Sequence, residues 1–263
     1  MERLRLPALY FLAATLAGAL AESSGWLFLS VGLSLFIPSL FAISAKEEGV
    51  VIAIFSSLAA LLALALLSPR SIPSIFSLQV AGAILLKLKE RADLAVLLTA
   101  IILFGEAIFE EFLFEQLPLT SSNFAPYRFG IYFFAATLFA ELVYGIYLLL
   151  IKEGNLFLKL KFGFWPVILF LSSGVGTLIL SGALKVAAIN LVVASLALFT
   201  AQGISVSLFF FKKLTGWWRL LFIVIVILFP SGFLLSSLIL GFLDNWIDFR
   251  KFEGGGEDEG DIG

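Results

Sequence analysis

Glu141 is the side chain whose position in the sequence most clearly requires a chemical explanation. It lies 12 residues into an apolar run, 129–151, that is long enough to cross a membrane as a helix. An ionisable side chain near the centre of a bilayer costs about 2.5–3.5 kcal/mol. Helical spacing places Thr137 and Tyr144 on the same face as Glu141. Two interpretations stay open: these three side chains bind a substrate, a cation or a proton, or Glu141 is neutral and hydrogen-bonded to a neighbouring helix.

Four glutamates form a second group of candidate ligands. Glu106 and Glu110 are one helical turn apart, as are Glu111 and Glu115, and no Lys or Arg occurs between residues 93 and 127. Like charges at this spacing repel along a helix unless they are solvated, protonated or share a cation. Carboxylate oxygens are good ligands for hard cations. The cluster is therefore either a cation site on the outer face or a solvated outer loop that marks the end of a span.

The apolar run 186–211 contains a stripe of polar side chains. Ser195, Gln202 and Ser205 share one helix face, and Asn190 lies about 120° away from Gln202. Amide and hydroxyl groups in membrane helices commonly join helices through hydrogen bonds. The stripe is therefore a packing surface or, in the alternative interpretation, part of a pore or substrate-binding face. Small residues at short spacing, which indicate close packing, occur at Ser30/Ser34 and Gly174/Gly176.

The residue inventory excludes most catalytic and metal-binding chemistry. The chain contains no Cys and no His, which removes disulfides, thiolate and imidazole metal sites, haem ligation and His-dependent catalysis. Glu110 and Glu111 match the start of the double-glutamate motif of CAAX-type intramembrane proteases. However, Glu115 occupies the position of the required Arg, and the required His residues are missing. We therefore expect a non-enzymatic protein with no catalytic residue, no metal and no cofactor.

The composition of the chain indicates whether it lies in water or in a membrane. Of 263 residues, 61% are hydrophobic and only 14% are charged, and the mean hydropathy is +1.09. Soluble domains carry roughly 25% charged residues, so this chain is predicted to be an all-α, polytopic integral membrane bundle. The net charge of −2 does not suggest a nucleic-acid partner. Nine apolar runs are candidate spans: 6–21, 24–45, 50–68, 72–86, 94–109, 129–151, 164–184, 186–211 and 220–243.

The distribution of basic residues predicts the orientation. With the N-terminus inside and nine spans, twelve of the 17 Lys and Arg residues fall on the inner side, as the positive-inside rule requires. An eight-span arrangement, in which 164–184 does not cross and the tail is inside, gives the same count.

The loops are too short for a soluble nucleotide-binding domain, so active transport would need an ion gradient or a separate subunit. The tail, 252–263, is acidic and rich in glycine, and is predicted to be disordered.

The C-terminal part of the chain resembles a known family. Residues 190–251, about a quarter of the chain, are similar to the C-terminal region of the YybS-like family, bacterial membrane proteins that carry a domain of unknown function. The ending of this stretch is its most specific part. The matching positions are Asn190, Gln202, Gly203, Phe209 to Phe211, Pro230, Gly241 to Asp244, Trp246 and Asp248 to Lys251, which includes Arg250.

This resemblance implies a second, more distant one. YybS-like proteins are grouped with the substrate-binding S components of energy-coupling factor transporters, which have six spans with both ends inside. The implied organisation is a six-span S-component-like bundle over 1–151, followed by a three-span region over 152–251. The three additional spans depart from a plain S component.

The expected function is small-solute binding or transport in the bacterial cytoplasmic (inner) membrane, with the N-terminus inside. The expected partners are the lipid bilayer, a small-molecule solute and coupling or ATPase subunits. The alternative is a membrane scaffold or regulator that binds partner proteins through 244–251 and the amphipathic segment 155–164.

Overall fold

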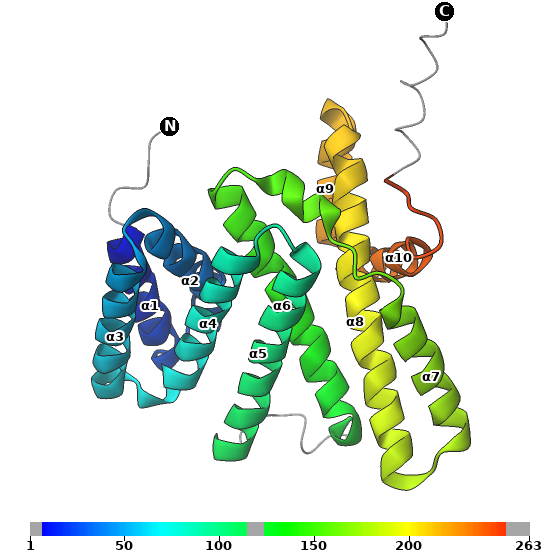
Figure 1. The fold of residues 1–263 in the computed structure, drawn as a ribbon, viewed down its shortest axis with the longest axis horizontal. Coiled ribbons are helices and arrows are strands. Elements are labelled where there is room, and N and C mark those ends of the chain that lie inside the picture. Colours follow the sequence, from blue (N-terminus) through cyan, green and yellow to red (C-terminus); the bar gives the residue numbers. More distant parts are fainter. Residues whose placement is uncertain (1–6, 115–123, 251–263) are drawn as a thin grey trace, which may run out of the picture. The chain divides into compact units, whose positions relative to one another are not determined.

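The apolar runs of the sequence fold as helices. The computed structural model describes residues 7–114 and 124–250, and within these ranges all regular secondary structure is helical (Figure 1). The chain divides into two compact units, residues 1–157 (unit 1) and 158–263 (unit 2), and each is described by itself. The prediction of an all-α protein is therefore confirmed for the described residues. Glu115, Lys251 and the acidic tail 252–263 lie outside the described residues.

Unit 1 contains six long helices, and α2 lies at their centre. This helix contacts α1, α3, α4 and α6, while α5 packs against α4 and α6. Gly82 of α4 permits one close approach, because a Cβ atom there would lie 2.6 Å from the carbonyl oxygen of Pro38 in α2. The helices are α1 (Pro7–Ser23), α2 (Leu27–Glu47), α3 (Val50–Leu67), α4 (Ile72–Leu88), α5 (Ala92–Phe114) and α6 (Arg128–Leu150). Short 3₁₀ turns form η1 (Pro69–Ser71), η2 (Ala125–Tyr127) and η3 (Gly154–Lys159).

Unit 2 is organised around one long helix. Helix α8 (Gly182–Lys213) packs against α7 (Trp165–Ile179) and is crossed by α10 (Pro230–Leu243), while α9 (Gly216–Leu228) precedes α10 (Figure 1). The apolar run 220–243, predicted as one span, is instead two helices that are bent by 108° at Phe229. The physical reason is Pro230, which lacks an N–H donor and disfavours helical backbone in the residue before it.

The outer surfaces of these helices are apolar, as a lipid environment requires. In the candidate span formed by α3, only 28% is buried within the structure, and the side chains of Leu62 and Leu66 are exposed. A water-soluble protein rarely exposes apolar surface on this scale. The structure thus agrees with a multi-pass membrane protein.

The number of helices able to cross a membrane is smaller than the number of apolar runs. Within the described residues, six helices are long and apolar enough to cross, or seven if the bent pair α9 and α10 forms one span. Helices α1 and α7 are apolar but shorter, so the predicted count of nine is not confirmed. The six candidate spans are Phe28–Glu47, Val50–Leu67, Pro69–Leu88, Ala92–Leu113, Ala125–Leu150 and Gly182–Lys213.

Candidate functional site

A cavity of about 340 Å³ opens among five helices of unit 1. It lies where the C-terminal ends of α1 and α5 meet the N-terminal ends of α2, α4 and α6, so it occupies one end of the unit. Its apolar wall includes Leu78, Leu103 and Phe139. Its polar lining consists of two carboxylates and four hydroxyl groups, from Glu22, Ser30, Ser34, Ser74, Glu106 and Tyr132.

Hydrogen bonds hold the acidic groups around this cavity. Ser71 Oγ donates to Glu22 Oε2 at 2.8 Å, which ties the end of α1 to the start of α4. Ser74 Oγ donates to Glu110 Oε1 at 2.7 Å, which ties α4 to α5. These neutral donors position carboxylates without cancelling their charge. The cavity is therefore an apolar space with an acidic polar lining.

Of the four glutamates predicted as a cation site, the three that the structure describes make different contacts. Glu106 lines the cavity and Glu110 lies one turn further along α5, whereas Glu111 forms an ion pair with Arg128 at 3.2 Å. Glu115 is not among the described residues. Over residues 7–114 and 124–250, no three acidic side chains are arranged to hold a metal ion. Glu106, Glu110 and Glu111 belong to helix α5, so the loop of the alternative is wrong at these positions, although they do lie near the end of a candidate span.

The predicted Glu141 face is buried but does not line the cavity. Glu141 is 2% exposed, and its Oε1 atom makes no hydrogen bond within the described part of the chain. The Thr137 hydroxyl donates to the carbonyl oxygen of Phe133 at 2.8 Å, and the Tyr144 hydroxyl donates to that of Lys89 at 2.7 Å. Thr137 and Tyr144 therefore bond to separate backbone groups and not to Glu141, and the role of the three side chains in substrate binding stays a prediction.

Replacing Glu141 with glutamine tests whether its carboxyl group has a structural role. We expect the free energy of unfolding to change by no more than about 1 kcal/mol, because the substitution keeps the shape and breaks no hydrogen bond at Oε1. Thermal unfolding of the purified protein in detergent measures this. Tyr144→Phe is the comparison, since it removes the hydroxyl bonded to Lys89 and is expected to cost about 1 kcal/mol. A loss for Glu141→Gln well above that of Tyr144→Phe would contradict the expectation.

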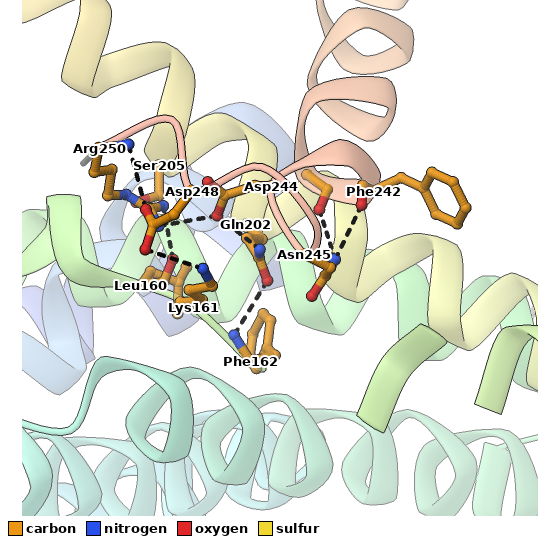
Figure 2. Close-up of polar contacts among 11 residues, drawn as sticks. Leu160, Lys161, Phe162, Gln202, Ser205, Phe242, Asp244, Asn245, Asp248 and Arg250 are labelled. Carbon is orange, nitrogen blue, oxygen red and sulfur yellow. Dashed lines mark hydrogen bonds and ion pairs between the residues drawn. The ribbon is translucent and has the colours of Figure 1, made fainter. Parts of the chain in front are cut away.

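Unit 2 contains a polar network centred on the fully buried Asp244 (Figure 2). Asp244 Oδ2 accepts hydrogen bonds from Gln202 Nε2 at 2.8 Å and from Arg250 Nη1 at 2.9 Å. Gln202 Oε1 in turn accepts from the backbone N–H of Phe162 at 3.1 Å. Gln202 therefore uses both ends of its amide to join α8 to two other segments. This geometry is that of a packing contact.

Arg250 extends the network to the segment before α7. Its Nη2 atom donates to the carbonyl oxygen of Leu160 at 2.9 Å and to Ser205 Oγ at 3.3 Å. Nearer the surface, Lys161 Nζ lies 3.3 Å from Asp248 Oδ2 (Figure 2). The residues that follow α10 are thus fixed to α8 and to residues 160–162.

The remaining predicted residues of unit 2 make other contacts. Asn190 and Ser195 each donate to a backbone carbonyl oxygen of their own helix, at 2.9 Å and 2.7 Å. The Trp246 ring packs against the rings of Phe242 and Phe164, with centroids 4.6 Å and 5.8 Å away. Of the predicted residues, the structure therefore brings together Gln202, Ser205, Asp244, Asp248 and Arg250.

Gly203 lies at the point where α10 crosses α8. A Cβ atom at Gly203 would lie 1.6 Å from the carbonyl oxygen of Ser237, and one at Gly241 would lie 1.8 Å from that of Phe199. The two backbones are therefore in direct contact, an arrangement that small residues permit in membrane proteins. Of the predicted close-packing glycines, Gly176 approaches Ala188, but nothing lies within 4 Å of a Cβ at Gly174.

Sequence reasoning missed most of the cavity lining. The spacing of Ser30 and Ser34 marks them only as close-packing residues, as does the spacing of Gly18 and Glu22, and no sequence pattern marks Ser74 or Tyr132. Spacing relates residues within one helix, whereas these five lining residues belong to four helices. The available signal was the ionisable Glu22 at the end of the first apolar run.

Comparisons of the chain with protein-family models, with curated proteins and with solved structures found no match.

Proposed function

We propose that this chain is a non-enzymatic, multi-pass protein of the bacterial cytoplasmic membrane that binds or passes a small solute through the cavity of unit 1. The cavity carries this proposal. Small-molecule sites are mainly apolar clefts of roughly 300–1,000 Å³ with a few convergent polar groups, and they commonly lie between the helices of bundles. A volume of about 340 Å³ with hydroxyl and carboxyl groups from five helices fits that description.

The proposed topology gives the cavity an orientation. If the N-terminus is inside and α1 crosses the membrane, the C-terminal end of α1 is outside, and the cavity is at that end. A solute could then enter from the outer side. The nine-span arrangement requires α1, α7 and the bent pair α9 and α10 each to cross once. In this arrangement, the six helices of unit 1 would form the S-component-like bundle, which would work with coupling or ATPase subunits.

The scaffold alternative assigns partner binding to 244–251 and 155–164, and it requires the charged groups of 244–251 to be available. Asp244, Asp248 and Arg250 instead make hydrogen bonds and ion pairs with other residues of unit 2. Solute binding is therefore the function that the geometry supports better.

Filling the cavity tests the proposed function. Ser34 lines the cavity, and its hydroxyl donates to the carbonyl oxygen of Ser30 in its own helix. We expect Ser34→Phe to weaken solute binding at least tenfold, because the ring would occupy the binding space. The measurement is a thermal-shift screen of the purified full chain in detergent against a library of small metabolites.

The matched control is Ser172→Phe. Ser172 also donates to a carbonyl oxygen of its own helix, but it is exposed on α7. We expect this variant to retain every thermal shift of the unmodified chain. Solutes that bind equally well to Ser34→Phe would show that the cavity is not the site, and a screen without any shift would contradict solute binding.

A further inference from the structure

We propose that the solute is a small organic cation with an ammonium group. This inference rests on the proposed function and specifies the class of its substrate. It is carried by the charge of the cavity lining, by an unpartnered buried hydroxyl group and by the volume of the cavity.

The carboxylates give the cavity its preference for positive charge. Glu22 and Glu106 line the cavity, and none of the described residues that line it is basic. The nearby Arg128 forms an ion pair with Glu111 and lies over the ring of Phe129 at 5.0 Å. A carboxylate beside an apolar wall is costly unless an opposite charge or a hydrogen-bond donor satisfies it. Ser71 already supplies a donor to Glu22, and an ammonium group would add the opposite charge.

Tyr132 is an independent indication of a ligand. Its side chain lines the cavity and it is only 8% exposed, yet its hydroxyl group has no hydrogen-bond partner among the described residues. Buried polar groups are nearly always hydrogen-bonded, so this hydroxyl calls for a partner beyond the described residues, and a ligand in the cavity would be one. The rings of Tyr132 and Phe139 also line the cavity, and aromatic rings attract cations, quaternary ammonium groups in particular.

The volume of the cavity favours an organic cation over a metal ion. Protein oxygen atoms bind Ca²⁺ or Mg²⁺ at about 2.0–2.6 Å and must surround the ion closely. A space of about 340 Å³ with an apolar wall is much larger than such a site, but it lies at the small end of known ligand pockets. An ammonium ion with a short hydrocarbon or hydroxyl-bearing chain satisfies the acidic, hydroxyl and apolar parts of the lining together.

Matched pairs of probes test the charge directly on the unmodified full chain. The cations are choline and ethanolamine, and the neutral analogues with carbon in place of nitrogen are 3,3-dimethylbutan-1-ol and propan-1-ol. Isothermal titration calorimetry in detergent is expected to show at least tenfold tighter binding of a cation than of its analogue. Equal binding within both pairs, no binding of either cation, or binding of Na⁺ or Ca²⁺ alone would overturn the proposal.

Two variants and a control test whether the cation binds in the cavity. We expect Glu106→Gln to weaken cation binding at least tenfold and Tyr132→Phe to weaken it several-fold. The exposed Glu90, in the turn after α4, provides the control, and Glu90→Gln is expected to bind like the unmodified chain. Unchanged cation binding in a folded Glu106→Gln variant would overturn the proposal.

The outcomes separate this inference from the proposed function. A neutral or anionic solute whose binding is lost in Ser34→Phe would overturn the cation class and leave the cavity as the solute site. If no solute shows binding that depends on Ser34, both proposals fail. The comparison of paired probes uses only the unmodified chain, so a variant that does not fold cannot obscure it.

Discussion

Replacing Gly203 with alanine is expected to destabilise unit 2 by about 3 kcal/mol or more. The new Cβ would overlap the Ser237 carbonyl oxygen, which is 1.6 Å from its position, and the Ser237 carbonyl carbon, which is 2.4 Å away. These are backbone atoms, so no side-chain rotation can relieve the overlap. Helix α10 would have to move away from α8 and would lose the contacts that surround the crossing. Four of the five Trp residues lie in unit 2, so tryptophan fluorescence during thermal unfolding in detergent reports this loss.

Gly174→Ala is the matched control for this prediction. Gly174 is also a helical glycine of unit 2, but a Cβ there meets nothing within 4 Å. Because alanine favours helix by up to about 1 kcal/mol over glycine, this variant should be as stable as the unmodified chain or slightly more so. Gly241→Ala should behave like Gly203→Ala, since its Cβ would lie 1.8 Å from the Phe199 carbonyl oxygen. Equal unfolding temperatures for Gly203→Ala and Gly174→Ala would show that the helices do not cross closely here.

The apolar runs predicted the helices because the length and uniformity of a hydrophobic segment are properties of the local sequence. Most of the nine runs coincide with one described helix, whereas 164–184 continues past the end of α7 into the start of α8 and 220–243 covers the pair α9 and α10. The bend in that pair has a local signal in Pro230, which lies inside the run predicted as one span. Span counts were harder to predict, because α1 and α7 are too short for length alone to decide whether they cross.

The sites were less predictable, because they depend on which helices become neighbours. Its place in an apolar run makes Glu141 a candidate, and the structure buries it, but the helix period cannot show that the cavity forms around Glu106 and Tyr132 instead. Likewise, Gln202 and Asp244 are 42 residues apart, and only the fold brings them within 2.8 Å. Both residues were singled out by the resemblance to the YybS-like family, which itself stays a prediction.

Replacing Asp244 with alanine is expected to destabilise unit 2 by about 3–5 kcal/mol, the usual cost of removing one partner from a buried ion pair. The Asp244 side chain is fully buried and that of Arg250 is 15% exposed, so the remaining guanidinium group would lose its counter-charge in a poorly hydrated site. Gln202 Nε2 would also lose its acceptor. Asp244→Asn should cost less than alanine, because it keeps an oxygen that accepts from Gln202.

The partly exposed ion pair of the same network is the control. The side chains of Lys161 and Asp248 are 31% and 26% exposed, so solvent weakens their attraction, and Lys161→Gln should cost no more than about 1 kcal/mol. The double variant Asp244→Leu with Arg250→Met should be more stable than Asp244→Ala, since it leaves neither charge buried and unpaired. Thermal unfolding followed by tryptophan fluorescence compares these variants with the unmodified chain. If Asp244→Ala were as stable as Lys161→Gln, the buried pair would not hold the end of α10 against α8, and the network would be a surface feature of little structural consequence.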